Sequence, residues 1–409
     1  MNQLDEKRLA NKLINHDSFM CESSFEIFER IAELRSQGKQ IANMAFGELD
    51  FDTPEHIRTA AVRAIEKGQT RYTPVRGSDE LIRAVQQKLI IENKIAYEKS
   101  EIMAGAGSKQ LIFNAMMATL NERDEVIISA PFWSSYPKIV SLNNGTPVVI
   151  MTNNEEDYKI TPVKLRAVLT SRTKWIILNS PGNPSGSVYT AQEFTEIAKV
   201  LSDYPDVLVL SDEIYEFLTY DATFISFASA VPHMKERTLT INGVSKSFAM
   251  TGWRIGYAAG PRWLINGMLK IQENSTSNPC SVSQSAATEA LNGDKSFIKS
   301  WREELIIRRN CACDILARSP LLHFLKPQAA LYIFINYQRV LKRPASDIIS
   351  LSDDFAIVKH LIEYAGVVVL PGANFGMPGH VRLTFCMGYE DVIKACFAIV
   401  EAIKFHEVS

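Results

Sequence analysis

The sequence of 409 residues contains no apolar run long enough to cross a membrane, and its N-terminal stretch is charged. A membrane helix needs roughly 18 consecutive apolar residues, and a signal peptide needs an apolar centre. Lysine and arginine together (44) nearly balance aspartate and glutamate (46), which leaves a net charge of -2. This balance gives no electrostatic reason to expect nucleic acid or a membrane surface as a partner. We therefore expect a cytoplasmic protein with small-molecule substrates.

Cysteine and histidine are scarce as well. The six cysteines are scattered, with one close pair at Cys311 and Cys313, and the seven histidines do not cluster. This spacing fits neither a disulfide framework nor a set of zinc ligands, so we expect reduced thiols and no metal. The glycine-rich stretch at 105–110 lacks the third glycine of a dinucleotide-binding loop.

The middle of the chain alternates short apolar runs with helical patterns. Runs that are apolar along their whole length are typical of strands buried on both faces, as in a parallel sheet covered by helices. Thr190 and Glu193 have the spacing of a capping box, which predicts a helix over 191–201. The expected strands lie at 124–130, 173–180, 206–213 and 237–243.

From about residue 295 the pattern changes to one long helix followed by further strands. We expect an α/β fold in which a large domain, residues 51–294, has a mostly parallel sheet sandwiched by helices. A smaller α+β domain would combine residues 1–50 with residues 295–409. A chain of 409 residues is long enough for two such cores.

Polar side chains follow the ends of three of the expected strands. Asn183, Asp212, Tyr215, Lys246 and Arg254 lie at or just after a strand end, where α/β sheets bind their ligands. Burial beside a second cation would favour a neutral lysine amine that can act as a nucleophile. An aspartate after a buried strand needs a cationic partner. The alternatives are an ordinary solvated lysine and an aspartate that caps a turn.

A phosphate site is predicted beside this crevice. Ser245 and Arg254, together with the helix N-terminus that follows Gly107 and Ser108, suit a dianionic phosphate. A reactive lysine, an aspartate that requires a cationic ring and a phosphate cradle together indicate pyridoxal 5'-phosphate as the cofactor.

The chain also resembles a known family. The stretches "GELDFDTPEHI", "RYTPVRG", "GSKQ", "APFWSSYP", "NSPGNPSG", "SDEIYE", "GVSKSFAMTGWRIGY" and "VRLTF" look like signatures of class I (fold type I) aminotransferases, in the right order. The resemblance is to the aspartate aminotransferase-like gamma subgroup and covers nearly the whole chain. It implies a homodimer and a ping-pong transfer of an amino group. The donor would be an L-amino acid, aspartate-like or aromatic, and the acceptor a 2-oxo acid such as 2-oxoglutarate.

The resemblance also implies catalytic roles. Lys246 would bind the cofactor aldehyde and move the substrate proton as general base and acid. Asp212 would pair with the ring nitrogen, and Asn183 and Tyr215 would bond the ring oxygen. Trp133 would stack on the ring; its alternative is core packing, but its place in "PFWSSYP" favours stacking.

Further residues would bind the phosphate and the substrate. Arg382 would clamp the substrate carboxylate near the backbone of Gly47; its alternative is an ordinary arginine at a strand edge. Tyr72 would reach the phosphate from the neighbouring subunit. The phosphate-binding residues within one chain would be Gly107, Ser108, Lys109, Ser245 and Arg254.

The pocket for the substrate side chain is less well defined. Ser24 lies in the stretch that corresponds to this pocket, flanked by Glu22 and Glu26. If either glutamate faced the pocket, it would disfavour an acidic donor; a solvated helix face is the alternative. Arg76 lies four residues after Tyr72 and could bind a distal carboxylate from the neighbouring subunit.

The chain departs from the family pattern at three positions. Leu49 replaces the proline of "GEPDF", and Ala329 and Leu331 replace the glycine and the aromatic residue of "PxGAFY". We expect these departures to reshape the wall of the site. Two other functions also stay open: a β-lyase or synthase with the same cofactor, and a cofactor-binding regulator. A regulator would carry a DNA-binding module before the motifs, which begin here at residue 47.

Overall fold

The structure, a computed structural model, describes residues 31, 33–34, 36–341 and 353–404. At its centre lies a seven-stranded sheet with the strand order β2-β8-β7-β6-β5-β3-β4. Only β8 runs antiparallel to its neighbours. The four expected strands are confirmed as β3, β5, β6 and β7. The bounds are β2 Ile102–Gly105, β3 Glu125–Ala130, β4 Thr146–Met151, β5 Thr173–Asn179, β6 Leu208–Asp212, β7 Thr238–Gly243 and β8 Gly256–Ala259.

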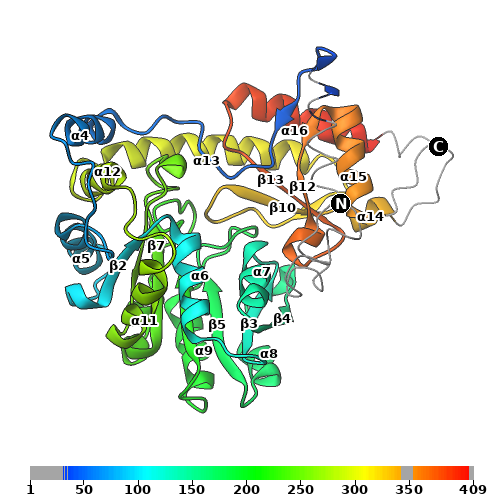
Figure 1. The fold of residues 1–409 in the computed structure, drawn as a ribbon. Coiled ribbons are helices and arrows are strands. Elements are labelled where there is room, and N and C mark those ends of the chain that lie inside the picture. Colours follow the sequence, from blue (N-terminus) through cyan, green and yellow to red (C-terminus); the bar gives the residue numbers. More distant parts are fainter. Residues whose placement is uncertain (1–30, 32, 35, 342–352, 405–409) are drawn as a thin grey trace, which may run out of the picture.

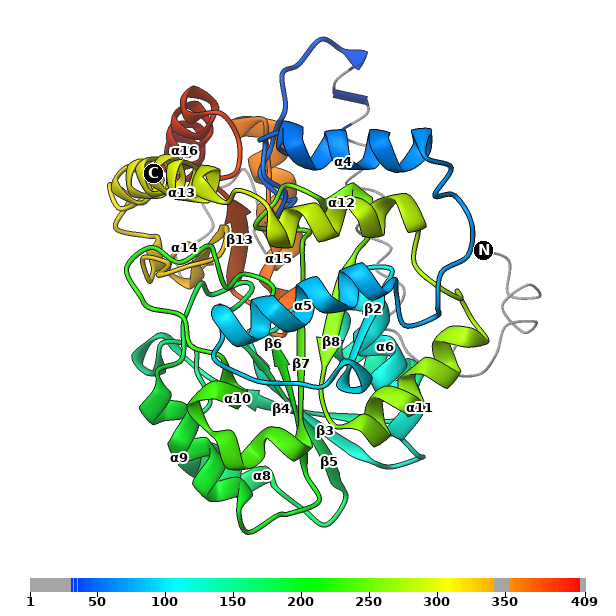
Figure 2. The same cartoon turned by 90° about the vertical axis from the view of Figure 1, so that its left-hand side faces the viewer.

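Helices cover both faces of this sheet (Figures 1 and 2). Neighbouring residues Ile127 and Ile128 of β3 belong to opposite apolar cores, which is why the centre of the strand, residues 126–128, is apolar on both faces. One face carries α6 (Ser108–Thr119), α7 (Ser135–Leu142) and α11 (Arg262–Glu273). The other face carries α5 (Asp79–Ile91), α8 (Pro162–Val168), α9 (Ala191–Leu201), α10 (Phe227–Ala230) and α12 (Ser281–Asn292), with α4 (Glu55–Glu66) packed on α12.

A second unit is built on a four-stranded antiparallel sheet, in the order β12-β13-β10-β9. Figure 1 shows α13 extending from the region of α12 toward this sheet. The strands are β9 His323–Phe324, β10 Tyr332–Asn336, β12 Leu370–Pro371 and β13 His380–Thr384. The helices of this unit are α13 Ser296–Leu316, α14 Gln338–Leu341, α15 Asp354–His360 and α16 Tyr389–Lys404.

The N-terminal segment is joined to the second unit. β1 (Ala42–Asn43) pairs in parallel with β11 (Val367–Val368), and one apolar core combines residues 31–49 with residues 305–403. This shared core supports the expected domain division after residues 50 and 294, which stays a prediction. None of the helices that the structure describes is long and apolar enough to cross a membrane.

Candidate active site

A cavity of about 490 Å³ lies between the carboxyl ends of the central strands and the second unit. The parallel register places Asn179 of β5 beside Asp212 of β6, and Asp212 beside Ile241 of β7. The predicted site residues that line the cavity are Gly47, Ser108, Lys109, Trp133, Asn183, Asp212, Tyr215, Ser245, Lys246, Arg254 and Arg382. The structure therefore brings together residues that are as much as 335 positions apart in the chain (382 minus 47).

Lys246 lies three residues after the end of β7 and is half-buried. Its Nζ donates a hydrogen bond to the carbonyl oxygen of Gly47 over 2.6 Å. A Cβ atom on Gly47 would lie 1.7 Å from the hydroxyl of Tyr332, so only glycine fits at this position. The hydrogen bond to Gly47 thus holds the lysine amine at the cavity, which Gly47 and Lys246 both line.

Asp212 is a buried carboxylate at the end of β6. Its Oδ2 accepts a hydrogen bond from the hydroxyl of Tyr136 over 2.6 Å, and its Oδ1 accepts one from the backbone N–H of Ile214 over 3.3 Å. Burial raises the pKa of Asp212 to about 6, although these two bonds and the charge of Lys246 act in the opposite direction. Within the described residues, no lysine, arginine or histidine forms an ion pair with this carboxylate.

The start of α6 forms a compact cradle with Arg254. Gly107 has a φ of 86°, and a Cβ atom on it would lie 2.5 Å from Nη2 of Arg254. A Cβ on Gly256 would lie 2.4 Å from the backbone nitrogen of Ser108. The guanidinium therefore lies directly against the helix N-terminus, whose first N–H groups have no partner inside the helix. Arg254 itself has a left-handed backbone with a φ of 56°, a strained conformation that is typical of functional sites.

Trp133 and Lys109 form another wall of the cavity. Nζ of Lys109 lies 4.9 Å from the centre of the Trp133 ring, which is a cation–π contact. Burial, followed by the nearby charges of Arg254, Lys138 and Lys246, lowers the pKa of Lys109. Its ammonium group thus lies over the indole.

Arg382 lies on β13, and its guanidinium is buried. Among the described residues, no carboxylate forms an ion pair with it. Its Nη1 donates to Oδ1 of Asn183 over 3.0 Å, its Nη2 donates to the carbonyl of Ala45, and its Nε has no hydrogen-bond partner. Burial lowers the pKa of Arg382. A buried cation without an anion is costly, so the site is complementary to an anionic ligand.

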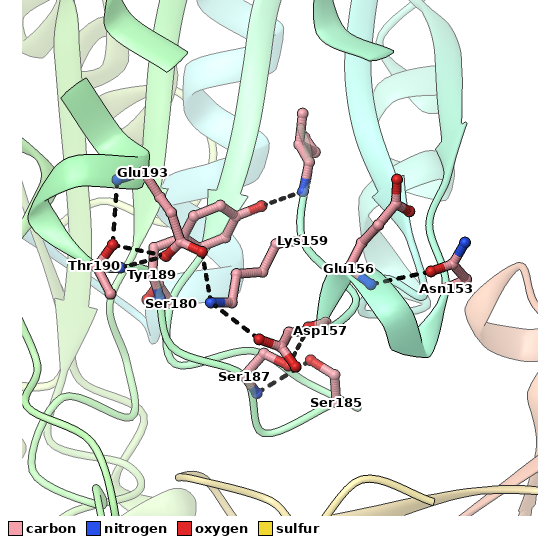
Figure 3. Close-up of polar contacts among 11 residues, drawn as sticks. Asn153, Glu156, Asp157, Lys159, Ser180, Ser185, Ser187, Tyr189, Thr190 and Glu193 are labelled. Atoms are coloured by element: carbon pink, nitrogen blue, oxygen red, sulfur yellow. Dashed lines mark hydrogen bonds and ion pairs between the residues drawn. The ribbon is translucent and has the colours of Figure 1, made fainter. Parts of the chain in front are cut away.

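Asn183 lies in a loop that is fixed at its far side. The backbone N–H of Tyr189 donates to Oγ of Ser180 over 3.0 Å, and Oγ of Ser187 donates to the carbonyl of Asp157 over 2.5 Å. Figure 3 shows these contacts. They hold the stretch 180–190, and with it the amide that contacts the arginine clamp.

The same network confirms the predicted capping box of α9. The backbone N–H of Glu193 donates to Oγ1 of Thr190 over 3.2 Å, and that of Thr190 donates to the Glu193 carboxylate over 2.7 Å. Lys159 pairs with Glu193 over 2.8 Å and also approaches Asp157 (Figure 3). Lys159 therefore connects α9, which follows the stretch 180–190, to the segment around Asp157.

Some predicted residues do not line the cavity. Gly107 lies just behind it, against Arg254. The side chain of Tyr72 is 91% exposed on the described chain. Arg76 donates to the backbone carbonyls of Lys99 and Ile102 in its own chain. Ser24, Glu22 and Glu26 lie outside the described residues.

The three departures from the family pattern lie away from the cavity. Leu49, Ala329 and Leu331 are buried in the core of the second unit or beside it, and none of them is a lining residue. The expectation that they reshape the wall of the site stays a prediction, since they could act only from behind it. Their side chains fill the core behind the wall, and the wall itself is formed by the neighbouring Tyr332.

Sequence reasoning missed several residues of the wall. Among them, Tyr136 and Tyr332 bond through their hydroxyls to side chains of predicted site residues, Asp212 and Tyr215 respectively. A buried tyrosine hydroxyl usually needs a partner, but the local sequence gives no signal that separates Tyr332 from a core residue. The remaining lining residues that were not predicted are Ala45, Phe46, Ser134, Ser135, Asn179, Ile214, Thr251 and Leu370.

The residues present fit pyridoxal 5'-phosphate. The close approach of Arg254 to the N-terminus of α6 suits a dianionic phosphate. The carboxylate of Asp212 is buried without a cation in the described chain, so it suits a protonated ring nitrogen. Lys246 lies within the same cavity and is available for the aldehyde.

The family is shown by comparison with known proteins. Residues 39–399 match the family model of aminotransferase class I and II. A protein of Rickettsia conorii named "Probable aspartate/prephenate aminotransferase" is 43% identical over 380 residues, which are 92% of this chain and 94% of that protein. The aspartate/prephenate aminotransferase of Cereibacter sphaeroides is 42% identical over 374 residues, 91% of this chain and 94% of its own.

Solved structures agree. The crystal structure of the aspartate aminotransferase from Rhizobium meliloti has a TM-score of 0.90 and 41% identity, and covers 93% of this chain and 95% of its own. That of the Thermus thermophilus aspartate aminotransferase with maleate has a TM-score of 0.88 and 34% identity, covering 96% and 99%. The fold is that of the fold type I aminotransferases. The chain belongs to the class I and II aminotransferases and is an aminotransferase that acts on amino acids and 2-oxo acids.

Proposed function

We propose that this aminotransferase uses pyridoxal 5'-phosphate and takes its amino group from a dicarboxylic amino acid, with aspartate first, in a ping-pong reaction with a 2-oxo acid. The observation that carries the proposal is the pair of cations on different walls of the cavity. Arg382 is buried without a carboxylate among the described residues, and Lys109 lies over Trp133. Two separate cations fit the two carboxylates of such a substrate.

The roles of the chain follow from its contacts. Arg382, oriented by Asn183, binds the substrate α-carboxylate, and Lys246 removes and returns the proton at the substrate Cα. Asp212 would pair with the ring nitrogen of the cofactor and keep it protonated, and the hydroxyl of Tyr215 would bond the ring oxygen; both residues line the cavity. When bound, the cofactor supplies an aldehyde that carries the amino group and a cationic ring that withdraws electrons from the substrate.

The phosphate would be bound by backbone and side-chain groups at the start of α6. Ser108, Ser245 and Arg254 line this end of the cavity, and the first N–H groups of the helix, including that of Lys109, point out of the helix end. We propose that Lys109 contributes its backbone N–H to the phosphate and its ammonium to the substrate side chain. Aspartate is also the substrate in the printed names of several relatives.

We also propose a homodimer in which Tyr72 reaches the phosphate of the neighbouring subunit. The support is the exposure of Tyr72 together with that of Val62 and Ile65 on the preceding helix α4, because exposed apolar side chains of this kind often mark an interface. A cytoplasmic location is proposed as well. The described cysteines are free thiols, which is usual in a reducing compartment.

The proposal is tested by adding single amino acids to the purified protein loaded with pyridoxal 5'-phosphate. Aspartate is expected to bleach the visible absorbance of the bound aldehyde and to yield oxaloacetate. Phenylalanine and arginine test the aromatic and the basic alternatives. Bleaching by arginine but not by aspartate would overturn the proposed substrate class. Absorbance changes without a 2-oxo acid product would contradict amino-group transfer.

A further inference from the structure

Tyr332 is the first residue of β10 and lines the cavity, although nothing in its sequence context distinguishes it from core. It is paired with Thr384 of β13, and Arg382 lies two residues before Thr384, on the same face of the sheet. Diagonal neighbours of this kind are within reach of aromatic and long side chains. Tyr332 and Arg382 are therefore placed together by the register of two antiparallel strands.

The ring of Tyr332 supports the arginine clamp. The guanidinium carbon of Arg382 lies 4.2 Å from the centre of the Tyr332 ring and 4.8 Å from that of Phe375. A planar guanidinium stacks on aromatic faces, so these rings limit how Arg382 can turn. Because Nε of Arg382 has no partner and no carboxylate binds this side chain within the described residues, the rings and two oxygen acceptors define its orientation.

The hydroxyl of Tyr332 makes a second connection. It lies 2.8 Å from the hydroxyl of Tyr215, and either oxygen can be the donor. Burial, followed by the proximity of Tyr332, raises the pKa of Tyr215 well above its ordinary value, so the Tyr215 hydroxyl keeps its proton. If Tyr332 donates to Tyr215, the proton of Tyr215 is free to point into the cavity. In that arrangement the hydroxyl of Tyr332 leaves the proton of Tyr215 directed into the cavity.

The same side chain fills the space next to Gly47. A Cβ atom on Gly47 would lie 1.7 Å from the Tyr332 hydroxyl oxygen, and the carbonyl of Gly47 accepts the hydrogen bond of Lys246. One phenol therefore contacts the arginine that faces the substrate, the tyrosine that faces the cofactor and the segment that directs the lysine.

We propose that Tyr332 is a positioning residue that joins the carboxylate clamp of Arg382 to the Tyr215 hydroxyl that faces the cofactor ring. The inference rests on the proposed function. The inference assigns two separate roles to Tyr332. Its aromatic ring orients Arg382 for the substrate carboxylate, and its hydroxyl directs the proton of Tyr215 to the ring oxygen of the cofactor.

Two variants separate these roles. Tyr332→Phe keeps the ring and removes the hydroxyl, whereas Tyr332→Leu removes both. Two quantities are measured on the loaded protein without turnover: the pKa of the visible absorbance of the bound cofactor, and the Kd of succinate from difference spectra. Tyr220→Phe is the matched control, because the hydroxyl of Tyr220 donates to the carbonyl of Ala330 in the same unit and Tyr220 does not line the cavity.

Tyr332→Phe is expected to raise the pKa of the absorbance by about 0.5–1 unit, the effect of losing one neutral hydrogen bond, with a succinate Kd within about twofold of the original. Tyr332→Leu is expected to raise the succinate Kd by roughly tenfold or more, which corresponds to the loss of a desolvated cation–π contact. Tyr220→Phe is expected to change neither quantity.

The inference is overturned if the pKa of the visible absorbance is the same in Tyr332→Phe as in the control Tyr220→Phe. It is also overturned if Tyr332→Phe weakens succinate as much as Tyr332→Leu does, because ring and hydroxyl would then not act separately. A poorly folded Tyr332→Leu protein leaves the decision to the absorbance pKa of Tyr332→Phe. If the unmodified protein binds pyridoxal 5'-phosphate without any visible absorbance, the proposed function fails, and the inference fails with it.

Discussion

Replacing Tyr136 with phenylalanine removes one hydroxyl from the cavity wall and leaves the ring in place. That hydroxyl donates to Oδ2 of Asp212 over 2.6 Å, and both side chains are buried. A hydrogen bond to a charged group contributes about 1.5–3 kcal/mol, and about 1.4 kcal/mol corresponds to one pKa unit. With the bond in place, burial already raises the pKa of Asp212 to about 6. In Tyr136→Phe we expect this pKa to rise further, by roughly one to two units.

The direction of the pH effect follows from the form that binds. Ionised Asp212 pairs with a protonated ring nitrogen, so affinity for the cofactor is lost as the pH falls through the pKa of Asp212. In Tyr136→Phe this loss occurs at a higher pH. In the cofactor-free protein the raised pKa has the opposite consequence. The stability that it contributes is full below the unfolded-state pKa of about 3.9 and is lost as the pH rises through the folded-state value.

The assay is a titration of the cofactor-free protein with pyridoxine 5'-phosphate, followed by tryptophan fluorescence across the neutral pH range. This ligand has the ring and the phosphate but no aldehyde, so it does not react with Lys246. Tyr158→Phe is the matched control, because Tyr158 belongs to the same apolar core as Tyr136 and packs against Phe334 and His380. The pH at which affinity for the ligand falls is compared between Tyr136→Phe and the unmodified protein. If this pH differs by less than about 0.3 units, or is lower in the variant, the reasoning is refuted.

Three further predictions address the cations and the close contact at Gly47. Arg382→Lys keeps the charge but loses the planar fork, and is expected to lower kcat/KM for aspartate and phenylalanine alike by roughly 30-fold or more; steady-state kinetics that show a loss for one donor alone would contradict this. Lys109→Gln is expected to raise the KM for aspartate by roughly tenfold while that for phenylalanine changes little, and an equal change for both donors would assign the ammonium to the phosphate. Gly47→Ala is expected to destabilise the protein by about 1–3 kcal/mol through the clash with the Tyr332 hydroxyl. Thermal unfolding of the double variant with Tyr332→Phe should then show a smaller loss than the two single changes added together.

Much of the large sheet can be predicted from the sequence because its strands are buried on both faces. Residues of β3 and β5 alternate between two apolar cores, so their runs are apolar throughout and end at polar residues. β2, β4 and β8 were not predicted. β2 and β8 each have four residues and include a glycine, Gly105 or Gly256, at which a Cβ atom would collide with the start of α6. Close backbone packing replaces apolar bulk there and leaves no periodic signal.

The residues of the candidate active site could be predicted for a different reason. Asn183, Asp212, Lys246 and Arg254 follow strand ends in a short stretch of the chain, and parallel strands bring their carboxyl ends to one edge. Tyr332 could not be found in this way, because its place depends on the pairing of β10 with β13 and on the absence of a side chain at Gly47. Its role is set by register between segments far apart in the chain, and local pattern carries no such information.

The charges of the cavity explain why these residues are useful together. Arg254 lies at the start of α6 on the side of the large sheet, Arg382 lies on the sheet of the second unit, and Asp212 lies at the end of β6. A buried charge without a partner destabilises the folded protein. A protonated ring and a substrate carboxylate would relieve these costs at the buried Asp212 and Arg382, and a phosphate would pair with the exposed Arg254. The relief therefore requires residues of both units, and Tyr332 lies between them, in contact with Tyr215 after β6 of the large sheet and Arg382 of the second unit.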